Sequence, residues 1–232
     1  AVGLGNLWGF AYRSSQGGGA AFVLLYIFVV LVVGIPIFVA EFSLGRSTNT
    51  SAVLAPIKAA GKRWSALGFL FLIAPLAIAS YYSVIMGWTA DIFFQSLFIG
   101  LPENTTQAGE LFNLIHNGTR DFVGQILSLV FALYVVSGGI KKGIEKLNKI
   151  CMPILFIILL GLVIWSAFLG NAGEGYRNFL FNFDLSQLAN PTTVRNAFSQ
   201  AFFSLSLGIG IMITYASYLN KKSDLTKQAV QI

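Results

Sequence analysis

The chain has 232 residues, of which 56% are hydrophobic and only 10% are charged, and its mean hydropathy is +0.74. Soluble globular domains carry about 25% charged residues, so the composition excludes an ordinary soluble enzyme and a disordered tail. A single cysteine and a single histidine exclude internal disulfides and zinc clusters. The sequence therefore indicates a protein embedded in a lipid bilayer.

A short uncharged run at the start of the chain is followed by five long ones. The first run covers residues 1–12; it is too short to span and lacks the charged flank of a signal peptide, so we interpret it as part of a truncated span. Each later run is long enough to cross about 30 Å of hydrocarbon as a helix, the form that satisfies its own backbone in lipid. These runs cover residues 20–40, 65–90, 122–140, 150–173 and 196–220. The expected fold class is an all-α polytopic membrane protein.

The basic residues are unevenly divided between alternate loops. Four of the fifteen lie in one set of loops: Arg13, Arg120, Arg177 and Arg195. The other eleven lie in the opposite set: Arg46, Lys58, Lys62, Arg63, Lys141, Lys142, Lys146, Lys149, Lys221, Lys222 and Lys227. The positive-inside rule predicts that the richer set is cytoplasmic. The net charge of +6 is then a topology signal, and nucleic acid is not an expected partner. The cytoplasmic stretch 47–65 is expected to form a short interfacial helix.

Two segments have features of interrupted helices. Residues 1–6 (AVGLGN) and 204–210 (SLSLGIG) combine paired glycines with Asn6, Ser204 and Ser206 at membrane depth. Glycines often serve close packing between membrane helices. Unwound backbone at that depth, however, is tolerated only where it is buried in protein or lines a cavity. Freed carbonyls can coordinate a cation, and the amino end of a half-helix attracts a carboxylate. The pattern favours a binding site over close packing.

Other polar residues in or near the spans are weaker indicators. Glu41 ends an uncharged run; either it pairs at the inner interface with a helix amide or a basic side chain, or it has a buried structural role. Asp91 is expected to be solvated near the outer interface. Tyr81 and Tyr82 lie centrally in a span, where one hydroxyl could face a ligand or join two helices.

The motifs at these positions resemble those of the neurotransmitter:sodium symporter family. The matching segments are 1–8 (AVGLGNLW), 34–36 (GIP) with Glu41, Gly45 and Arg46, 142–146 (KGIEK), 200–208 (QAFFSLSLG) and 213–218 (ITYASY). The resemblance implies an inverted-repeat transporter fold with discontinuous helices 1 and 6. Residues 1–220 would then form the membrane domain, with helix 1 truncated and helices 2–6 complete. Residues 221–232 would form the cytoplasmic loop after helix 6. On this basis the chain is expected to be an N-terminal-half fragment.

The resemblance also implies a function, which is sodium-coupled symport of a neutral amino acid or amine by alternating access. The location would be a bacterial or archaeal cytoplasmic membrane. The implied ligands of the first sodium site are the Ala1 carbonyl, the Asn6 side chain and Ser204, and that of the second is the Val2 carbonyl. The implied chloride positions are Tyr26, Gln200 and Ser204; the deciding residue of that site lies in a seventh helix, so chloride dependence is open.

The implied substrate site is built from both interrupted helices. The substrate carboxylate would meet the amides of Leu4 and Gly5 and the Tyr82 hydroxyl. The substrate ammonium would meet the carbonyls of Ala1, Phe203 and Ser204 and the Ser206 hydroxyl. The side-chain pocket would be shaped by Ile78, Phe203 and Ile209, with Phe203 also closing the outer lid.

The sequence departs from the family pattern at the outer gate. Gly9 stands where the family has an arginine that closes the gate, and Ala11 stands where it has a proline. Arg13 follows one helical turn after Gly9. These departures keep a non-transporting membrane scaffold open as an alternative. An ion channel is a second alternative. An intramembrane enzyme is not expected, because no base at membrane depth accompanies Ser204 and Ser206.

Overall fold

The computed structural model describes residues 3, 5–116, 118–181, 183–219 and 225. Over these residues the chain is helical, and the only extended pairing is an isolated bridge between Gly19 and Phe183. The chain divides into two compact units, one made of residues 1–75 and 166–232 and the other of residues 76–165.

Four helical segments in the described part of the chain are long and apolar enough to cross a membrane. They are Ala20–Thr48, Lys62–Phe98, Thr119–Ser137 and Ile140–Ala167. They confirm the first four long spans expected from the sequence; all four helices begin at or before the start of the uncharged run, and the last two end before the run does. The last expected span, 196–220, is interrupted, as its glycine and serine pattern predicted.

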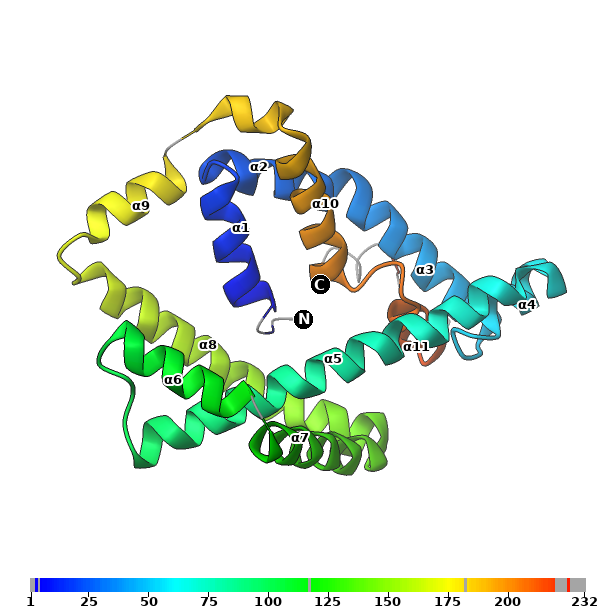
Figure 1. Cartoon of the computed structure of the whole chain (residues 1–232). Helices are drawn as coiled ribbons and strands as arrows, with labels where there is room; N and C mark the ends of the chain where they lie inside the picture. The colour runs from blue at the N-terminus through cyan, green and yellow to red at the C-terminus, as the bar shows by residue number, and fades with distance from the viewer. Residues whose placement is uncertain (1–2, 4, 117, 182, 220–224, 226–232) are drawn as a thin grey trace. The chain divides into compact units, whose positions relative to one another are not determined.

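The first unit contains both interrupted segments (Figure 1). Its helices near the amino end are η1 (Gly5–Gly9), α1 (Phe10–Gln16), α2 (Ala20–Val29), η2 (Val30–Gly34), α3 (Ile35–Thr48), α4 (Ala55–Ala60) and η3 (Lys62–Trp64). Those near the carboxyl end are α9 (Ala172–Leu180), η5 (Leu185–Ala189), α10 (Pro191–Leu205) and α11 (Ile211–Ser217). The short helix α4 lies in the stretch where the sequence predicted one.

The start of α10 is fixed by local chemistry. Asn190 precedes the helix, and its side-chain oxygen accepts a hydrogen bond of 2.9 Å from the amide of Thr192. Pro191 occupies the first helical position, where its missing N–H costs nothing. The preceding turn η5 is capped by Asp184, whose pKa is lowered because it accepts a hydrogen bond from the Ser186 hydroxyl.

Small residues let the helices of this unit approach closely. A Cβ at Gly45 of α3 would overlap the carbonyl oxygen of Ile213 in α11 and lie 2.8 Å from Ala216. A Cβ at Gly34 would lie 2.6 Å from a methyl group of Leu205 at the end of α10. Close backbone approach through glycine is typical of membrane helix packing. The α2–α3 segment therefore supports both halves of the interrupted helix.

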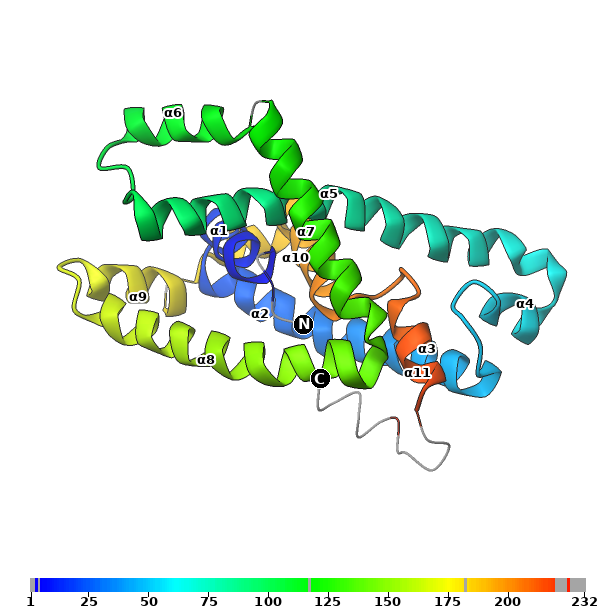
Figure 2. The ribbon, with the colours of Figure 1, turned by 90° about the horizontal axis from the view of Figure 1, so that it is seen from below.

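The second unit contains the carboxyl-terminal part of α5 and the helices that follow it (Figure 2). Its elements are α5 (Ser65–Phe98, which begins in the first unit), α6 (Thr105–His116), α7 (Thr119–Ser137), η4 (Ile140–Ile144) and α8 (Glu145–Ala167). Glycines again meet at the contact between α5 and α7, since a Cβ at Gly87 would lie 2.7 Å from the carbonyl carbon of Gly124.

The prediction that Asp91 is solvated is wrong. Its carboxylate pairs with the Arg120 guanidinium, with Nε 2.6 Å from Oδ2 and Nη2 2.7 Å from Oδ1. A second polar contact joins the same helices, because the Trp88 indole donates a hydrogen bond of 2.7 Å to Asp121. The sequence does not reveal these contacts, because the partners of Asp91 and Trp88 lie 29 and 33 residues further along the chain.

Candidate functional site

A polar cluster joins the first segment of the chain to α10. The Ser204 hydroxyl donates a hydrogen bond of 2.8 Å to Oδ1 of Asn6. The Gln200 side-chain amide donates to the same oxygen at 3.2 Å and to the Ser204 hydroxyl at 3.3 Å. Gln200 and Ser204 are four residues apart on α10 and therefore share one face. Residues almost two hundred positions apart in sequence thus form one hydrogen-bonded group.

Arg13 completes this cluster on the side of α1. Its Nη1 donates a hydrogen bond of 2.9 Å to Oε1 of Gln200, whose side chain is only 1% exposed. Because the Gln200 oxygen faces the guanidinium, its NH2 group is turned toward Asn6 and Ser204. Arg13 therefore orients the amide that organises the cluster.

The helix break lies directly after this cluster. Ser206 ends α10 with φ 54° and ψ 39°, a left-handed conformation that is uncommon for residues other than glycine. Gly208 and Gly210 also have positive φ values, 79° and 76°, and Gly210 precedes α11. Some backbone groups in this segment do not take part in regular helical hydrogen bonds. Their carbonyl oxygens are therefore available as hard ligands for a cation. The interruption expected at residues 204–210 is confirmed.

Glu41 stabilises the break from α3. Its Oε1 accepts a hydrogen bond of 2.7 Å from the amide of Gly208, and the side chain is 9% exposed. Beside it, Leu207 packs into a core cluster with Phe38 and Phe42 of α3. Of the two roles left open by the sequence, the structure supports a buried structural role, with a backbone amide as the partner.

The first segment also departs from a regular α-helix. Gly5–Gly9 form a wide π-type turn, and the amides of Asn6 and Leu7 both bond to the carbonyl of Gly3. Turns of this kind are frequent at functional sites. The expected ligands Ala1, Val2 and Leu4 lie outside the described residues. Gly5 is half-buried directly before Asn6.

The remaining expected substrate residues fall into both units. Phe203 and Ile209 flank the break in the first unit, where Phe203 is 41% exposed and Ile209 is half-buried. Ile78 and Tyr82 lie on α5 in the second unit, one helical turn apart on one face. Their place beside the cluster stays a prediction.

The expected chloride positions are only partly brought together. Gln200 and Ser204 are hydrogen-bonded to each other at 3.3 Å. Tyr26 of α2 packs its ring edge-on against Phe10, with centroids 5.0 Å apart, and is hydrogen-bonded to neither. In the cluster, Arg13 and Gln200 supply N–H groups that donate hydrogen bonds, and Asn6 and Ser204 supply oxygen atoms that accept them.

Sequence reasoning missed the role of Arg13 in this cluster. The available signal was its position, because it is a charged residue one helical turn after Gly9 in an otherwise uncharged segment. Residues four apart on a helix lie on the same face. That spacing could have directed attention to Arg13, but only the packing of α1 on α10 identifies Gln200 as its partner.

The fold and the site together define a helical membrane protein in which an interrupted helix meets the first segment at a polar cluster. The chain belongs to the sodium:neurotransmitter symporter family, whose model matches residues 1–113 and 113–232. The structure superposes on that of MhsT in complex with L-phenylalanine with a TM-score of 0.89 and 42% sequence identity. The match covers 100% of this chain and 53% of the MhsT chain.

Several curated relatives match the whole chain. MJ1319 of Methanocaldococcus jannaschii, an uncharacterized sodium-dependent transporter, is 41% identical over 243 residues, which cover 100% of this chain and 49% of the relative. YhdH of Bacillus subtilis, described in the same words, is 35% identical, with coverages of 100% and 52%. The mouse sodium-dependent neutral amino acid transporter B(0)AT2 is 28% identical, with coverages of 100% and 36%. The chain thus spans about half the length or less of the curated relatives that it matches.

Proposed function

We propose that the protein containing this chain is a sodium-coupled symporter of a neutral amino acid. The observation that carries the proposal is the cluster of Asn6, Gln200 and Ser204, which lies beside the helix break in α10–α11. Family membership supports the coupling to sodium. The names of the relatives and the phenylalanine complex of MhsT support the substrate class.

The chemistry of the cluster fits a hard cation such as Na⁺. Oδ1 of Asn6 and Oγ of Ser204 are 2.8 Å apart. Both are neutral oxygen atoms, which such cations prefer as ligands. A cation bound between them would require the Ser204 hydroxyl proton to turn away, so that both oxygens present lone pairs. The Gln200 amide, held by Arg13, would remain as the donor that keeps Asn6 in position.

A bound cation would also explain coupling to an amino acid. In this proposal, the substrate carboxylate lies against the amide of Gly5, one residue before the cation ligand Asn6. The ammonium lies at the carbonyl end of α10, near Phe203 and Ser204. The positive charge of Na⁺ would offset the carboxylate, so each ligand would increase the affinity for the other.

We further propose that Arg13 takes over the outer-gate role for which Gly9 has no side chain. The hydrogen bond to Gln200 ties α1 to α10 beside the cluster, on the side that faces outward in this proposal. A bond of this type, with one charged partner, contributes roughly 1.5–3 kcal/mol. In this proposal the bond helps to hold the two helices together while a substrate is bound.

The proposal is tested by ligand binding to the protein expressed from its complete gene. Tritiated L-phenylalanine, the ligand in the MhsT structure, is the first probe, followed by unlabelled amino acids as competitors. We expect saturable binding in NaCl and at least a tenfold weaker binding in KCl. Equal binding in the two salts would refute sodium coupling.

Transport itself is measured in proteoliposomes with an inward sodium gradient. Saturable, sodium-dependent accumulation of the probe supports a symporter. Conductance that does not require an amino acid would indicate the ion channel instead. Sodium-dependent binding without accumulation would indicate the scaffold.

A further inference from the structure

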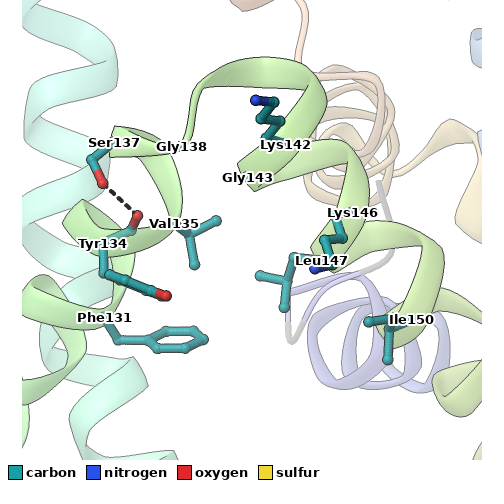
Figure 3. A pocket seen from close by; sticks show the side chains of 10 residues that line it. All are labelled: Phe131, Tyr134, Val135, Ser137, Gly138, Lys142, Gly143, Lys146, Leu147 and Ile150. Atoms are coloured by element: carbon teal, nitrogen blue, oxygen red, sulfur yellow. Dashed lines mark hydrogen bonds between the residues drawn. The ribbon is translucent and has the colours of Figure 1, made fainter.

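A cavity lies within the second unit. It has a volume of about 380 Å³ and is lined by residues from the end of α7, the turn η4 and the start of α8. In Figure 3, Phe131 and Val135 form one wall, and Leu147 and Ile150 form the other. Lys142 and Lys146 also line it. The cavity therefore combines an apolar interior with two ammonium groups.

This cavity, called the α7–α8 cleft below, takes its shape from a turn that contains glycines. Gly139 has a φ of 72°, and a Cβ at Gly138 would lie 3.1 Å from the Cα of Gly143. A Cβ at Gly143 would overlap the carbonyl oxygen of Val135. The backbones of α7 and η4 thus touch at the turn, and the side chains beyond the turn line the cleft. The cleft is consequently a built feature of the α7–α8 hairpin.

The two lysines are placed at the end of a membrane span. They lie within the first seven residues of the segment Ile140–Ala167, which is long and apolar enough to cross a membrane, so they are about 10 Å or less from its start. Headgroup phosphates occupy this level of a bilayer. Acyl chains occupy the deeper level, where Phe131, Leu147 and Ile150 line the cleft.

The charges of the cleft are not neutralised within the described residues. Neither Lys142 nor Lys146 is ion-paired to an acidic residue there. The nearby acid, Glu145, is occupied by Lys149 at 2.7 Å. Lys142 and Lys146 both line the cleft; in Figure 3 the Lys142 ammonium lies at the turn and the Lys146 ammonium lies beside Leu147, so the rim of the cleft carries positive charge at two points. Basic pockets between membrane helices are suited to anionic lipid headgroups.

We propose that the α7–α8 cleft binds an anionic phospholipid. The anionic headgroup lies at the rim of the cleft, in the positive field of Lys142 and Lys146, and one acyl chain lies along the apolar walls. A neutral phospholipid offers the same acyl chains but no net negative charge, so it binds more weakly. This inference is independent of the transport proposal, because it involves none of the residues of the polar cluster.

The test compares two double variants of the protein expressed from its complete gene. Lys142→Gln/Lys146→Gln removes the two cleft charges. Lys141→Gln/Lys149→Gln removes the same net charge from the same segment, but neither side chain lines the cleft. Each protein is placed in nanodiscs that contain equal amounts of phosphatidylglycerol and phosphatidylethanolamine, and retained lipids are counted by native mass spectrometry.

We expect wild type and the Lys141/Lys149 variant to retain phosphatidylglycerol in preference to phosphatidylethanolamine. The Lys142/Lys146 variant should lose this preference by about tenfold or more, given the contribution of each basic residue near the membrane surface. Equal losses in the two variants would show diffuse surface attraction and overturn the proposal. Absence of any preference in wild type would also overturn it, as expected if another part of the protein covers the cleft.

Two further experiments distinguish binding of a whole lipid from binding of a phosphate group alone. Glycerophosphoglycerol, which has the headgroup without acyl chains, should not displace phosphatidylglycerol, and displacement at equal concentration would contradict the lipid assignment. Leu147→Trp keeps both lysines but fills the apolar part of the cleft, so it should also lower retention. An unchanged thermal midpoint in each variant shows that the fold is intact.

Discussion

Replacing Arg13 with methionine removes the guanidinium while keeping a long, flexible side chain. The lost contact is the 2.9 Å hydrogen bond from Nη1 to Oε1 of Gln200. Gln200 is only 1% exposed, so water cannot easily replace the donor. A buried acceptor left without a partner costs about 1–3 kcal/mol. The change should therefore weaken the tie between α1 and α10 by roughly 5- to 150-fold.

The assay is the release of bound tritiated L-phenylalanine in saturating NaCl, measured by dilution into unlabelled ligand. We expect Arg13→Met to accelerate release by about tenfold or more, because the bond that closes the proposed outer gate is lost. Arg13→Lys should fall between Arg13→Met and wild type, since an ammonium keeps the charge but not the planar donor geometry. Arg195→Met is the matched control, because Arg195 is an exposed arginine on α10 itself. Release as slow from Arg13→Met as from wild type would refute the gating role.

Four further predictions concern the cluster, the helix break and the gate. Ser204→Ala removes two hydrogen bonds of the cluster and a proposed cation ligand, so the sodium concentration for half-maximal probe binding should rise at least tenfold; an unchanged value would contradict the ligand role. Glu41→Leu leaves the Gly208 amide without its acceptor, so the free energy of unfolding should fall by about 1–3 kcal/mol, whereas Glu41→Gln keeps an acceptor oxygen and should unfold at a higher temperature than Glu41→Leu. Gly45→Val would place its Cβ against the carbonyl oxygen of Ile213 and should lower the thermal midpoint by several degrees or prevent folding. In the control Gly161→Val the added Cβ would have no atom within 4 Å, so this variant should behave like wild type. Gly9→Arg also has open space at its Cβ and should change the rate of probe release little, because Arg13 already supplies the cation of the proposed gate; a markedly slower release would contradict the gating role of Arg13.

Much of the architecture could be predicted because its signals are local. A run of apolar residues predicts a spanning helix wherever it occurs, and four of the long spans are helices in the structure. The break at 204–210 was predictable for the same reason, since Gly208 and Gly210 permit the positive φ values that a helix cannot use.

The pairing of polar groups was not predictable from single residues. Asp91 gave no local sign that it meets Arg120, and Glu41 gave none that it accepts the amide of Gly208. Both partners are brought together by helix packing, which depends on small residues such as Gly45 and Gly87 meeting across helices. The chemistry of each group is a property of its side chain, but its partner is a property of the fold.

The sequence by itself determined that this protein is a helical membrane protein and where its helices are interrupted. Hydropathy and glycine pattern act over one or two helical turns, so these two conclusions need no tertiary contact. The family resemblance, and not the pattern, implied that Asn6 and Ser204 are cation ligands. Only the tertiary structure decided that Arg13 orients Gln200, and that Lys142 and Lys146 share a cleft with apolar walls. These contacts form where helix packing or a tight turn brings distant backbone segments together. Such distances in space cannot be read from the spacing of residues along the chain.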